Sequence, residues 1–504
     1  MTRSLPDQLL SRFSRLVASK MGLHFPPERW QDLEKGIRSV ASDLGAPDAE
    51  TCLEQMLSKP LAKEQIEILA SALTVGETYF FRETRSFEIL SEQVLPQLIA
   101  ARQGNERRLR IWSAGCCTGE EPYSIAISLD RILPKPSQWH ITILGTDINP
   151  RFLQKAAAGV FSDWSFRDAP PWVKQRYFKQ VGPHQFEILP RIKQMVTFAY
   201  LNLAEDLYPS LCNNTNAMDL IFCRNVLMYF SAEMAKRVIH GFHHALVDSG
   251  WLFVSAVEAS AELFPQFCEE GEVLYRKMER PSPGPATLFR DQIQDGPPLR
   301  DATASFAPVP VFAQEHLPEP GDAPSLLAGE KKSPANKQHT PWEEGLALLE
   351  QGLYGEAVTK LKTGCWQIEK TPEISALVAR ACANSGRLTE AREWAERAIS
   401  ADKLNPALHY LRATILQEQG DANEAVAAIK RALYLDPDFV LAHFALGNHA
   451  LRQGKSKEAD KHFTNAMTLL AAYQPDAPLP HADGLAAGRL RALIESTKLA
   501  WRTE

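Results

Sequence analysis

The segment LRIWSAGCCTGEEPYSIAISL, residues 109–129, constrains the fold of this chain more than any other segment. Leu109 to Trp112 form an apolar run that predicts a buried strand, and residues 113–119 are small enough for a tight turn. Pro122 suits the first turn of a helix, which the following apolar pattern continues. A strand, a turn of small residues and a helix predict an α/β domain whose backbone approaches a ligand.

The sequence of this turn and the residues that follow it limit the class of ligand that it can bind. It contains neither the glycine pattern of a dinucleotide site nor that of a P-loop. Glu120 and Glu121 follow directly, and carboxylates repel phosphate but suit hydroxyls, amines or a cation. A second predicted strand ends 26 residues beyond Glu121 at Asp147, where an acid can bind ribose hydroxyls. One such acid usually only complements a helix dipole, but the three together favour S-adenosylmethionine, which carries no phosphate.

Length and composition limit the protein's class. A chain of 504 residues is expected to form two or three domains, because single cores rarely exceed about 250–300 residues. The net charge of −6 disfavours nucleic acid as a partner, and no apolar run is long enough for membrane insertion. Without a signal-peptide pattern, we expect a cytoplasmic protein. The eight cysteines show no C-x-x-C pair and the histidines no metal spacing, so we assign no metal.

The C-terminal region repeats itself every 34 residues. Glycine recurs in each repeat, followed four residues later by glutamate and then by alanine. This period, with glycine between two helices and alanine where they touch, is typical of tetratricopeptide repeats, which form a binding solenoid. We expect four repeats and a final capping helix. The repeated glycines are Gly352, Gly386, Gly420 and Gly454.

Proline marks a boundary within the chain. Residues 281–340 hold 11 of the 34 prolines and show no sustained apolar period, which predicts a disordered linker. The predicted architecture is an α/β Rossmann-like domain at 73–280, preceded by a small all-α domain at 1–72. After the linker, an all-α tetratricopeptide solenoid occupies 341–504.

The N-terminal region combines amphipathic helices with exposed positive charge. Two readings stay open: an ordinary solvated helix face, or a docking surface for an acidic helical partner. The basic residues are Arg12, Arg15, Lys20, Arg29, Lys35 and Arg38.

Two further segments carry polar residues toward the predicted site. LTVGETYFFRE places three aromatic residues before Arg82, which suits a pocket wall or ordinary core packing. MDLIFCRNVLMYF predicts a buried strand that ends at Arg224 and Asn225, at the sheet edge where α/β proteins bind ligands. Tyr229 follows four residues later, and Ser231 is a good N-cap for the next helix.

These segments, with GTDI and LNLAED, resemble the CheR-type chemoreceptor glutamate methyltransferases in order and spacing over residues 1 to about 280. With the repeats, the chain is similar to the tetratricopeptide-bearing branch, which includes the WspC type linked to biofilm signalling. The resemblance implies transfer of a methyl group from S-adenosylmethionine to receptor glutamates. The products are glutamate methyl esters and S-adenosylhomocysteine.

The resemblance also implies site residues. Arg82 and Tyr229 are implied to lie nearest the transferred methyl group. Better-known members carry asparagine where Gly76 stands, so any contact from Gly76 would come from its backbone. The residues implied to contact the cofactor are Thr78, Arg82, Glu121, Asp147, Asn202, Leu203, Arg224 and Asn225, with Gly76 as a further candidate.

Partner choice is less determined. The family's small β-subdomain is expected near residues 176–197, where the chain is shorter than in members that bind a receptor pentapeptide. We therefore expect no pentapeptide binding, and a peptide or protein bound by the repeats instead. The expected substrates are cytoplasmic helices of a methyl-accepting chemoreceptor. Alternatively, the protein is a scaffold that senses S-adenosylmethionine without methylating receptors. Methylation of a small molecule or nucleic acid is a third, weaker reading.

Overall fold

The computed structural model describes most of the chain. Residues 1–279 and 340–504 belong to one compact unit. The predicted linker at 281–340 lies outside the described residues. The described stretches are 4–102, 107–204, 208–211, 213–277, 341–350, 352–364, 371–482 and 485–502.

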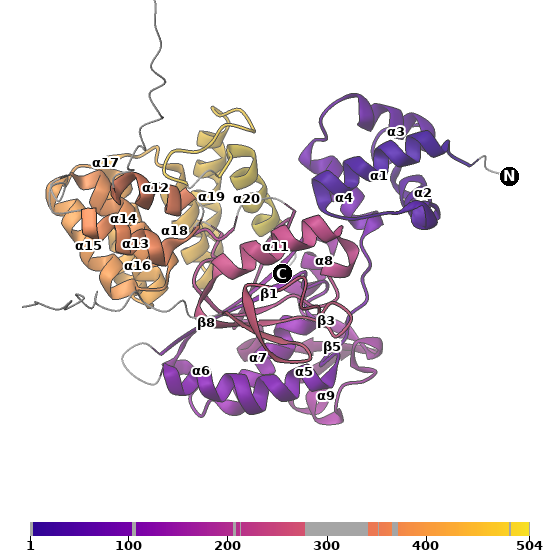
Figure 1. The fold of residues 1–504 in the computed structure, drawn as a ribbon, viewed down its shortest axis with the longest axis horizontal. Coiled ribbons are helices and arrows are strands. Elements are labelled where there is room, and N and C mark those ends of the chain that lie inside the picture. The colour runs from indigo at the N-terminus through magenta and orange to yellow at the C-terminus, as the bar shows by residue number, and fades with distance from the viewer. Residues whose placement is uncertain are drawn as a thin grey trace, which may run out of the picture. The chain divides into compact units, whose positions relative to one another are not determined.

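A seven-stranded sheet of order β6-β2-β1-β7-β8-β10-β9 lies at the centre of the region from residue 108 to 277 (Figure 1). The strands are β1 (Arg108–Ala114), β2 (His140–Asp147), β6 (Val196–Tyr200), β7 (Met218–Phe222), β8 (Leu246–Phe253), β9 (Phe267–Gly271) and β10 (Leu274–Lys277). Strands β6, β2, β1, β7 and β8 pair in parallel, and β10 and β9 are joined by antiparallel pairings. This sheet confirms the Rossmann-like α/β prediction.

Helices cover both faces of this sheet. They are α5 (Thr84–Ile89), α6 (Leu95–Ala101), α7 (Glu120–Ile132), α8 (Pro150–Ala158), α9 (Pro171–Tyr177), α10 (Pro190–Lys193) and α11 (Ala232–Ala245). Leu109 and Ile111 of β1 pack in one apolar cluster with α7, while Trp112 packs in another with Phe242 of α11. Figure 1 shows α7 and α11 on opposite sides of the sheet. Alternate residues of β1 thus face two covered surfaces, which explains its continuous apolar sequence.

Helix α11 begins where the sequence predicts. The Ser231 hydroxyl accepts a hydrogen bond from the Met234 backbone N–H at 3.2 Å. This is the expected N-cap geometry, in which a side-chain oxygen pairs one of the first free N–H groups of the helix.

A second, three-stranded sheet lies between α8 and β6 along the chain. Its order is β3-β5-β4, from β3 (Val160–Ser162), β4 (Phe178–Gly182) and β5 (Gln185–Ile188). Strands β4 and β5 fall in the predicted 176–197 range, and β3 precedes it. Phe80 is fully buried beside this sheet, with ring centroids 4.9 to 5.0 Å from those of Phe161, Phe166 and Phe178. The small sheet therefore anchors the segment that carries Arg82.

Four helices precede the sheet, as expected for an all-α N-terminal region. They are α1 (Asp7–Met21), α2 (Trp30–Val40), α3 (Ala49–Ser58) and α4 (Lys63–Leu73). Their apolar faces form one cluster that includes Phe13, Leu33 and Leu53. The exposed basic residues on the other faces include Arg12, Arg15, Lys20, Lys35 and Arg38.

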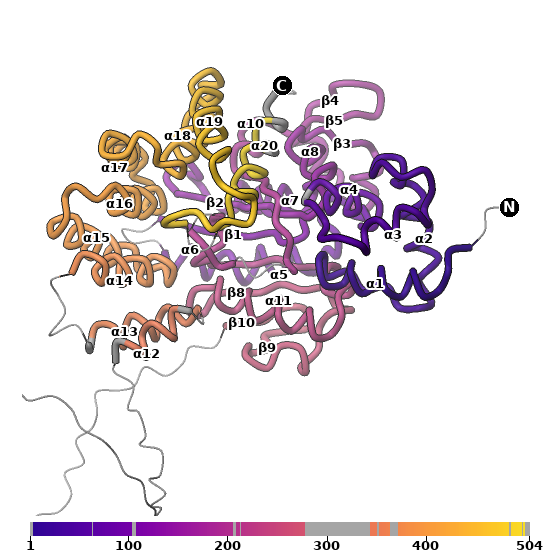
Figure 2. Tube along the Cα trace, turned by 90° about the horizontal axis from the view of Figure 1, so that it is seen from above, coloured from indigo at the N-terminus to yellow at the C-terminus, as the bar shows by residue number. Residues whose placement is uncertain are grey.

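The C-terminal region consists of successive antiparallel helix pairs, visible from above in Figure 2. They are α12 (Pro341–Glu350), α13 (Tyr354–Gly364), α14 (Pro372–Asn384), α15 (Leu388–Ala401), α16 (Pro406–Gln419), α17 (Ala422–Leu435), α18 (Val440–Arg452) and α19 (Ser456–Leu470), followed by α20 (Ala487–Arg502). Each repeated glycine lies between two paired helices with φ of 70° to 88°. This left-handed conformation, which glycine adopts most readily, confirms the tetratricopeptide arrangement.

Among the residues that the structure describes, no helix combines the length and the apolar character that crossing a bilayer requires.

Replacing Phe80 with alanine is expected to lower the free energy of unfolding by about 3–5 kcal/mol, because it removes a fully buried ring from an aromatic cluster. Urea unfolding of the full chain measures this change. The control is Val75→Ala in the same segment, where the side chain is 53% exposed and the expected change is within about 0.5 kcal/mol. Equal effects of the two substitutions would show that Phe80 does not anchor the segment.

Candidate active site

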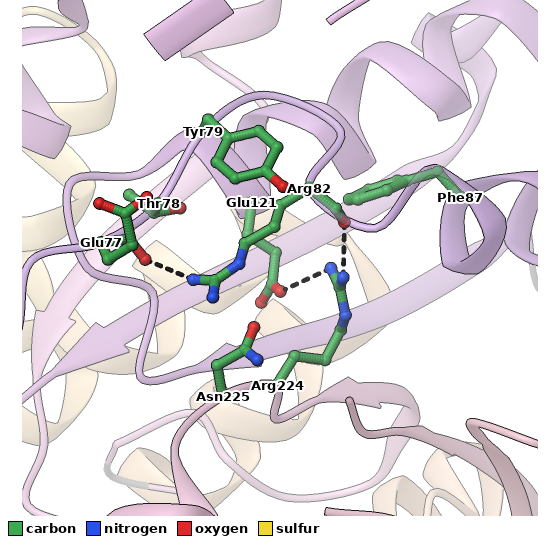
Figure 3. Close-up of a pocket in the computed structure, with 8 residues that line it drawn as sticks. All are labelled: Glu77, Thr78, Tyr79, Arg82, Phe87, Glu121, Arg224 and Asn225. Carbon is green, nitrogen blue, oxygen red and sulfur yellow. Dashed lines mark hydrogen bonds and ion pairs between the residues drawn. The ribbon is translucent and has the colours of Figure 1, made fainter. Parts of the chain in front are cut away.

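A pocket is lined by residues of the segment 77–87 and by residues that follow β1 and β7 in the chain. Figure 3 shows the side chains that line it. The residues that line it are Glu77, Thr78, Tyr79, Arg82, Phe87, Glu121, Arg224 and Asn225. Five of these were selected from the sequence: Thr78, Arg82, Glu121, Arg224 and Asn225. The predicted edge of the sheet therefore does bring together residues that lie as much as 147 positions apart, from Thr78 to Asn225.

Arg224 holds the pocket's walls together. Its side chain is 1% exposed and pairs with Glu121 at 3.2 Å and with Glu83 at 3.1 Å. Its Nη2 also donates to the Arg82 carbonyl, and its guanidinium carbon lies 5.5 Å from the centroid of the Phe87 ring. A buried cation needs such partners, because removal from water is costly. Arg224 thus ties the end of β7 to α7 and to the segment that carries Arg82.

The remaining donors of the pocket suit an anionic group. Arg224 Nε is buried and has no hydrogen-bond partner in the structure. Arg82 donates through Nη1 to the Glu77 carbonyl, and its guanidinium points into the pocket between Glu77 and Asn225 (Figure 3). Two guanidinium groups at one pocket are well matched to carboxylates, which accept their N–H bonds in pairs.

Glu121 is buried against the first turn. Its carboxylate accepts a hydrogen bond from Ser113 Oγ at 2.7 Å and pairs with Arg224. Burial raises the pKa of Glu121, and Arg224 and the Ser113 hydroxyl oppose the increase. The neighbouring Glu120 lies outside the pocket lining, because its carboxylate accepts from Thr118 and Ser165. Of the two adjacent acids, only Glu121 is placed to meet a ligand.

Asp147 ends β2 and holds the turn after β1. Its Oδ2 accepts from the Cys117 N–H at 2.9 Å and its Oδ1 from the Asn149 N–H at 2.8 Å. Burial raises the pKa of Asp147 to about 6, although the backbone N–H groups of Asn149 and Cys117 oppose the increase. Asp147 does not line the pocket, and its carboxylate instead binds the backbone of the turn that precedes Glu121.

The other predicted residues lie around this centre and outside the pocket lining. Asn202 Nδ2 donates to the Lys20 carbonyl at 2.7 Å, and its Oδ1 accepts from the Ala204 N–H. The adjacent Leu203 is 8% exposed. The Tyr229 carbonyl accepts from His24 N–H at 2.7 Å, so the N-terminal helices support this loop.

Gly76 has a steric reason to lack a side chain. A Cβ built at this position would lie 2.8 Å from Cζ of Phe152. Asparagine at this position would therefore require Phe152 to move, and a contact from Gly76 to a ligand would come from its backbone.

The backbone around the pocket is strained. Four residues other than glycine adopt a left-handed conformation there, with φ of 57°, 57°, 50° and 58° for Phe81, Glu83, Cys117 and Asn225. Such conformations cost of order 1–3 kcal/mol each and persist only where the surroundings fix them. Here the Phe81 N–H donates to Ser124 Oγ and the Cys117 N–H to Asp147, which fixes two of them.

Sequence reasoning missed Glu258, which fixes a third strained residue. This carboxylate is 4% exposed and accepts from the backbone N–H groups of Asn225, Val226, Met228 and Ser255. The Ser255 hydroxyl donates to it as well. Glu258 therefore sets the path of the loop from Asn225 toward Tyr229. An acid just beyond the end of β8 was the available signal, but its targets are backbone groups, which no sequence pattern reveals.

The two cysteines of the turn are structural. Burial raises the pKa of Cys116 and of Cys117 well above the usual value for a thiol, and Asp147 adds to both increases. A thiol with a raised pKa carries no thiolate at pH 7 and is a poor nucleophile. Among the described residues, no group of three or more metal-ligating side chains is arranged to hold a metal ion.

We expect binding of S-adenosylmethionine to weaken by about fourfold between pH 7.5 and 5.5 if the ionised form of Asp147, with its pKa of about 6, is the form that accepts ribose hydroxyls. Because burial raises this pKa, the binding form predominates above pH 6 and is lost as the pH falls through it. Calorimetric titration at both pH values measures the change. Asp147→Asn should bind weakly at both, without the pH dependence, and an unchanged wild-type affinity would contradict the assignment.

Glu258→Ala is expected to lower the free energy of unfolding by about 2–4 kcal/mol, because it leaves buried N–H groups without their acceptor. It should also raise the dissociation constant of S-adenosylmethionine at temperatures where the variant is folded. Glu262→Ala is the matched control, since Glu262 lies in the same loop and is exposed. A positioning role for Glu258 would be contradicted if Glu258→Ala had the same free energy of unfolding and the same affinity for S-adenosylmethionine as Glu262→Ala.

Comparison with known proteins agrees with this geometry. Residues 76–267 match the family described as CheR methyltransferase, SAM binding domain, and residues 410–463 match a tetratricopeptide repeat. The chain is 38% identical over 218 residues to chemotaxis protein methyltransferase 1 of Pseudomonas aeruginosa, covering 42% of this chain and 77% of that protein. It is 30% identical to a chemotaxis protein methyltransferase of Borreliella burgdorferi, covering 49% and 87%.

One relative extends over the repeats as well. The probable biofilm formation methyltransferase WspC of Pseudomonas putida is 27% identical over 445 residues, which cover 86% of this chain and 92% of that protein. The pocket at the carboxyl edge of the sheet lies within the matched methyltransferase region, and the solenoid follows it. The chain belongs to the CheR methyltransferase family and is an S-adenosylmethionine-dependent protein methyltransferase with C-terminal tetratricopeptide repeats.

Proposed function

We propose that this protein transfers the methyl group of S-adenosylmethionine to glutamate side chains on the cytoplasmic helices of a methyl-accepting chemoreceptor. The observation that carries the proposal is that two guanidinium groups, those of Arg82 and Arg224, line one pocket of a CheR-family domain. The names of its relatives, chemotaxis protein methyltransferases, support a chemoreceptor as the substrate.

The pocket is suited to a carboxylate nucleophile. A glutamate side chain, with an ordinary pKa of about 4.3, is ionised at pH 7 and needs no base to activate it. The chain must instead position the carboxylate and keep water from solvating it. Arg82 is placed to orient the carboxylate through its planar fork, while Tyr79 and Phe87 supply apolar surface.

The surroundings of the pocket fit S-adenosylmethionine, which supplies a methyl group on a sulfonium centre when bound. Asp147 is the proposed partner of the ribose hydroxyls, and Glu121 of a positively charged group. Arg224 Nε, a buried donor without a partner, is proposed to meet the ligand's carboxylate. Thr78, Asn202, Leu203 and Asn225 complete the proposed contacts, with Tyr229 beside Arg82 near the transferred methyl group.

Esterification changes the receptor's charge. A carboxylate becomes a neutral ester, so one negative charge is removed from a receptor helix at each modified site. Loss of charge in a helical bundle shifts the balance between its signalling states. The exposed basic residues of the N-terminal helices, including Arg12, Arg15 and Lys35, offer a surface for acidic helices of this kind.

We place the protein in a pathway that controls biofilm formation, supported by the WspC relative, which spans both the methyltransferase region and the repeats. The repeats are proposed to bind a peptide or protein that recruits the enzyme. The small sheet β3-β5-β4 is proposed not to bind a receptor pentapeptide, because the segment that forms it is short.

Arg82→Ala is expected to lower kcat/KM for receptor methylation by about 10²–10³-fold, because the carboxylate loses its orienting partner. The enzyme is incubated with tritiated S-adenosylmethionine and receptor-bearing membranes. The labelled methyl esters are then hydrolysed with base, and the tritiated methanol that is released measures the rate. The matched control is Arg85→Ala, three residues away, where the side chain is 66% exposed and outside the pocket. That variant should keep the wild-type rate.

The same assay separates the proposal from a scaffold function. No labelled methanol from the wild-type protein with its cognate receptor would contradict methylation. A scaffold that only senses S-adenosylmethionine would signal normally with Arg82→Ala and fail when residues 341–504 are deleted. If the protein is the proposed enzyme, signalling is lost with Arg82→Ala.

A further inference from the structure

The repeats contact the sheet through a buried ion pair. Glu418, near the end of α16, is 7% exposed and lies 3.0 Å from Arg110 Nη1 and 3.4 Å from Arg108 Nη1. Arg108 and Arg110 belong to β1 and are themselves 4% and 2% exposed. Both guanidinium groups are thus removed from water at the amino end of β1, opposite the carboxyl end that carries the pocket.

Glu418 is the group that compensates Arg108. Arg110 also donates to Asn214 and Asn216 within its own domain. The one hydrogen bond that the structure gives the Arg108 guanidinium goes to Glu418, while its Nε and Nη2 are buried without partners. A buried cation that loses its carboxylate is strongly destabilised. Glu418 is therefore the carboxylate that pairs with the buried Arg108 guanidinium, and Asp219 adds a favourable charge nearby.

The turn glycines of three consecutive repeats lie close to the end of α11 and to the first residues of β8 and β2. A Cβ built on Gly352 would be 3.3 Å from the His244 ring, and one on Gly386 would be 3.2 Å from Val247 Cγ1. At Gly420 it would be 3.5 Å from the His140 ring. The fourth equivalent glycine, Gly454, has nothing within 4 Å of that position. The close approach thus extends over three consecutive repeats and is absent at the fourth glycine.

A separate contact lies at the C-terminal end of the solenoid. Arg489 of α20 donates to the Tyr200 carbonyl at 3.3 Å, and its guanidinium carbon lies 4.5 Å from the centroid of the Tyr200 ring. Tyr200 ends β6. Two contacts at different strands fix both the position and the orientation of a rigid solenoid.

We propose that the amino edge of the methyltransferase sheet, formed by Arg108, Arg110, His140 and Val247, is a docking surface for the chain's own repeats, selected by Glu418. The repeats are then part of the methyltransferase unit, positioned by this contact and not by the covalent connection through residues 278–340. Any partner that binds the repeats is held at a set place relative to the pocket. This inference is independent of which receptor is methylated.

Charge reversal in the full-length chain tests the docking. Glu418→Arg and Arg108→Glu should each release the repeats, shifting the radius of gyration in small-angle scattering upward by several ångströms. The double exchange, Arg108→Glu with Glu418→Arg, should bring it part of the way back, because one ion pair is restored while Arg110 still faces a like charge. Glu373→Arg is the control, because Glu373 is exposed on α14, and it should cause no shift.

Hydrogen exchange supplies a second readout that distinguishes undocking from misfolding. In Glu418→Arg, amides near residues 108–110 and 420–422 should exchange about tenfold faster or more, while affinity for S-adenosylmethionine is retained. The proposal would be overturned if Glu418→Arg had the radius of gyration and the amide hydrogen exchange of the wild-type protein. It would also be overturned by a double exchange that stays as expanded as either single variant, because Glu418 would then not be the selecting residue.

Discussion

The structure of the active site depends on one buried cation, Arg224. It lies at the end of a central strand and pairs with carboxylates from two other segments, Glu121 of α7 and Glu83 beside Arg82. Because a guanidinium out of water must be compensated, these segments can take only the arrangement that places both acids against it. The pocket is the space that this arrangement leaves. Two of its four strained residues lie at this cation, since Glu83 pairs with it and Asn225 follows it in sequence.

The parts that sequence predicts are those determined by local pattern. The strand, the turn and the helix at 109–129 were predicted from an apolar run, a stretch of small residues and Pro122. The repeats were predicted from their 34-residue period. Pocket residues such as Arg224 and Asn225 were found because strand ends in a parallel sheet share an edge. Glu258 was missed because it acts on backbone N–H groups, and Glu120 proved to turn toward Ser165. Neither orientation has a periodic signal.

Ion pairs between residues far apart in the chain could not be predicted from the sequence either. Arg108 and Arg110 look like the flank of an ordinary strand, yet they are buried against Glu418, about 310 residues later. The repeat glycines were assigned to turns from their spacing, and their φ values agree. At Gly352 and Gly386 a side chain would also crowd a neighbour, since a built Cβ would lie 3.3 Å from His244 and 3.2 Å from Val247 Cγ1. A single residue type thus satisfies backbone conformation and close approach together.

We propose that the Arg224-centred pocket and the Asp147 turn together hold S-adenosylmethionine with its methyl group facing Arg82. A crystal structure of the full chain with S-adenosylhomocysteine tests this most directly. We expect the ribose hydroxyls within hydrogen-bond distance of the Asp147 carboxylate, the ligand's carboxylate at Arg224 Nε, and the sulfur open toward Arg82. A ligand whose ribose contacts other residues, or whose sulfur is closed off from Arg82, would contradict it.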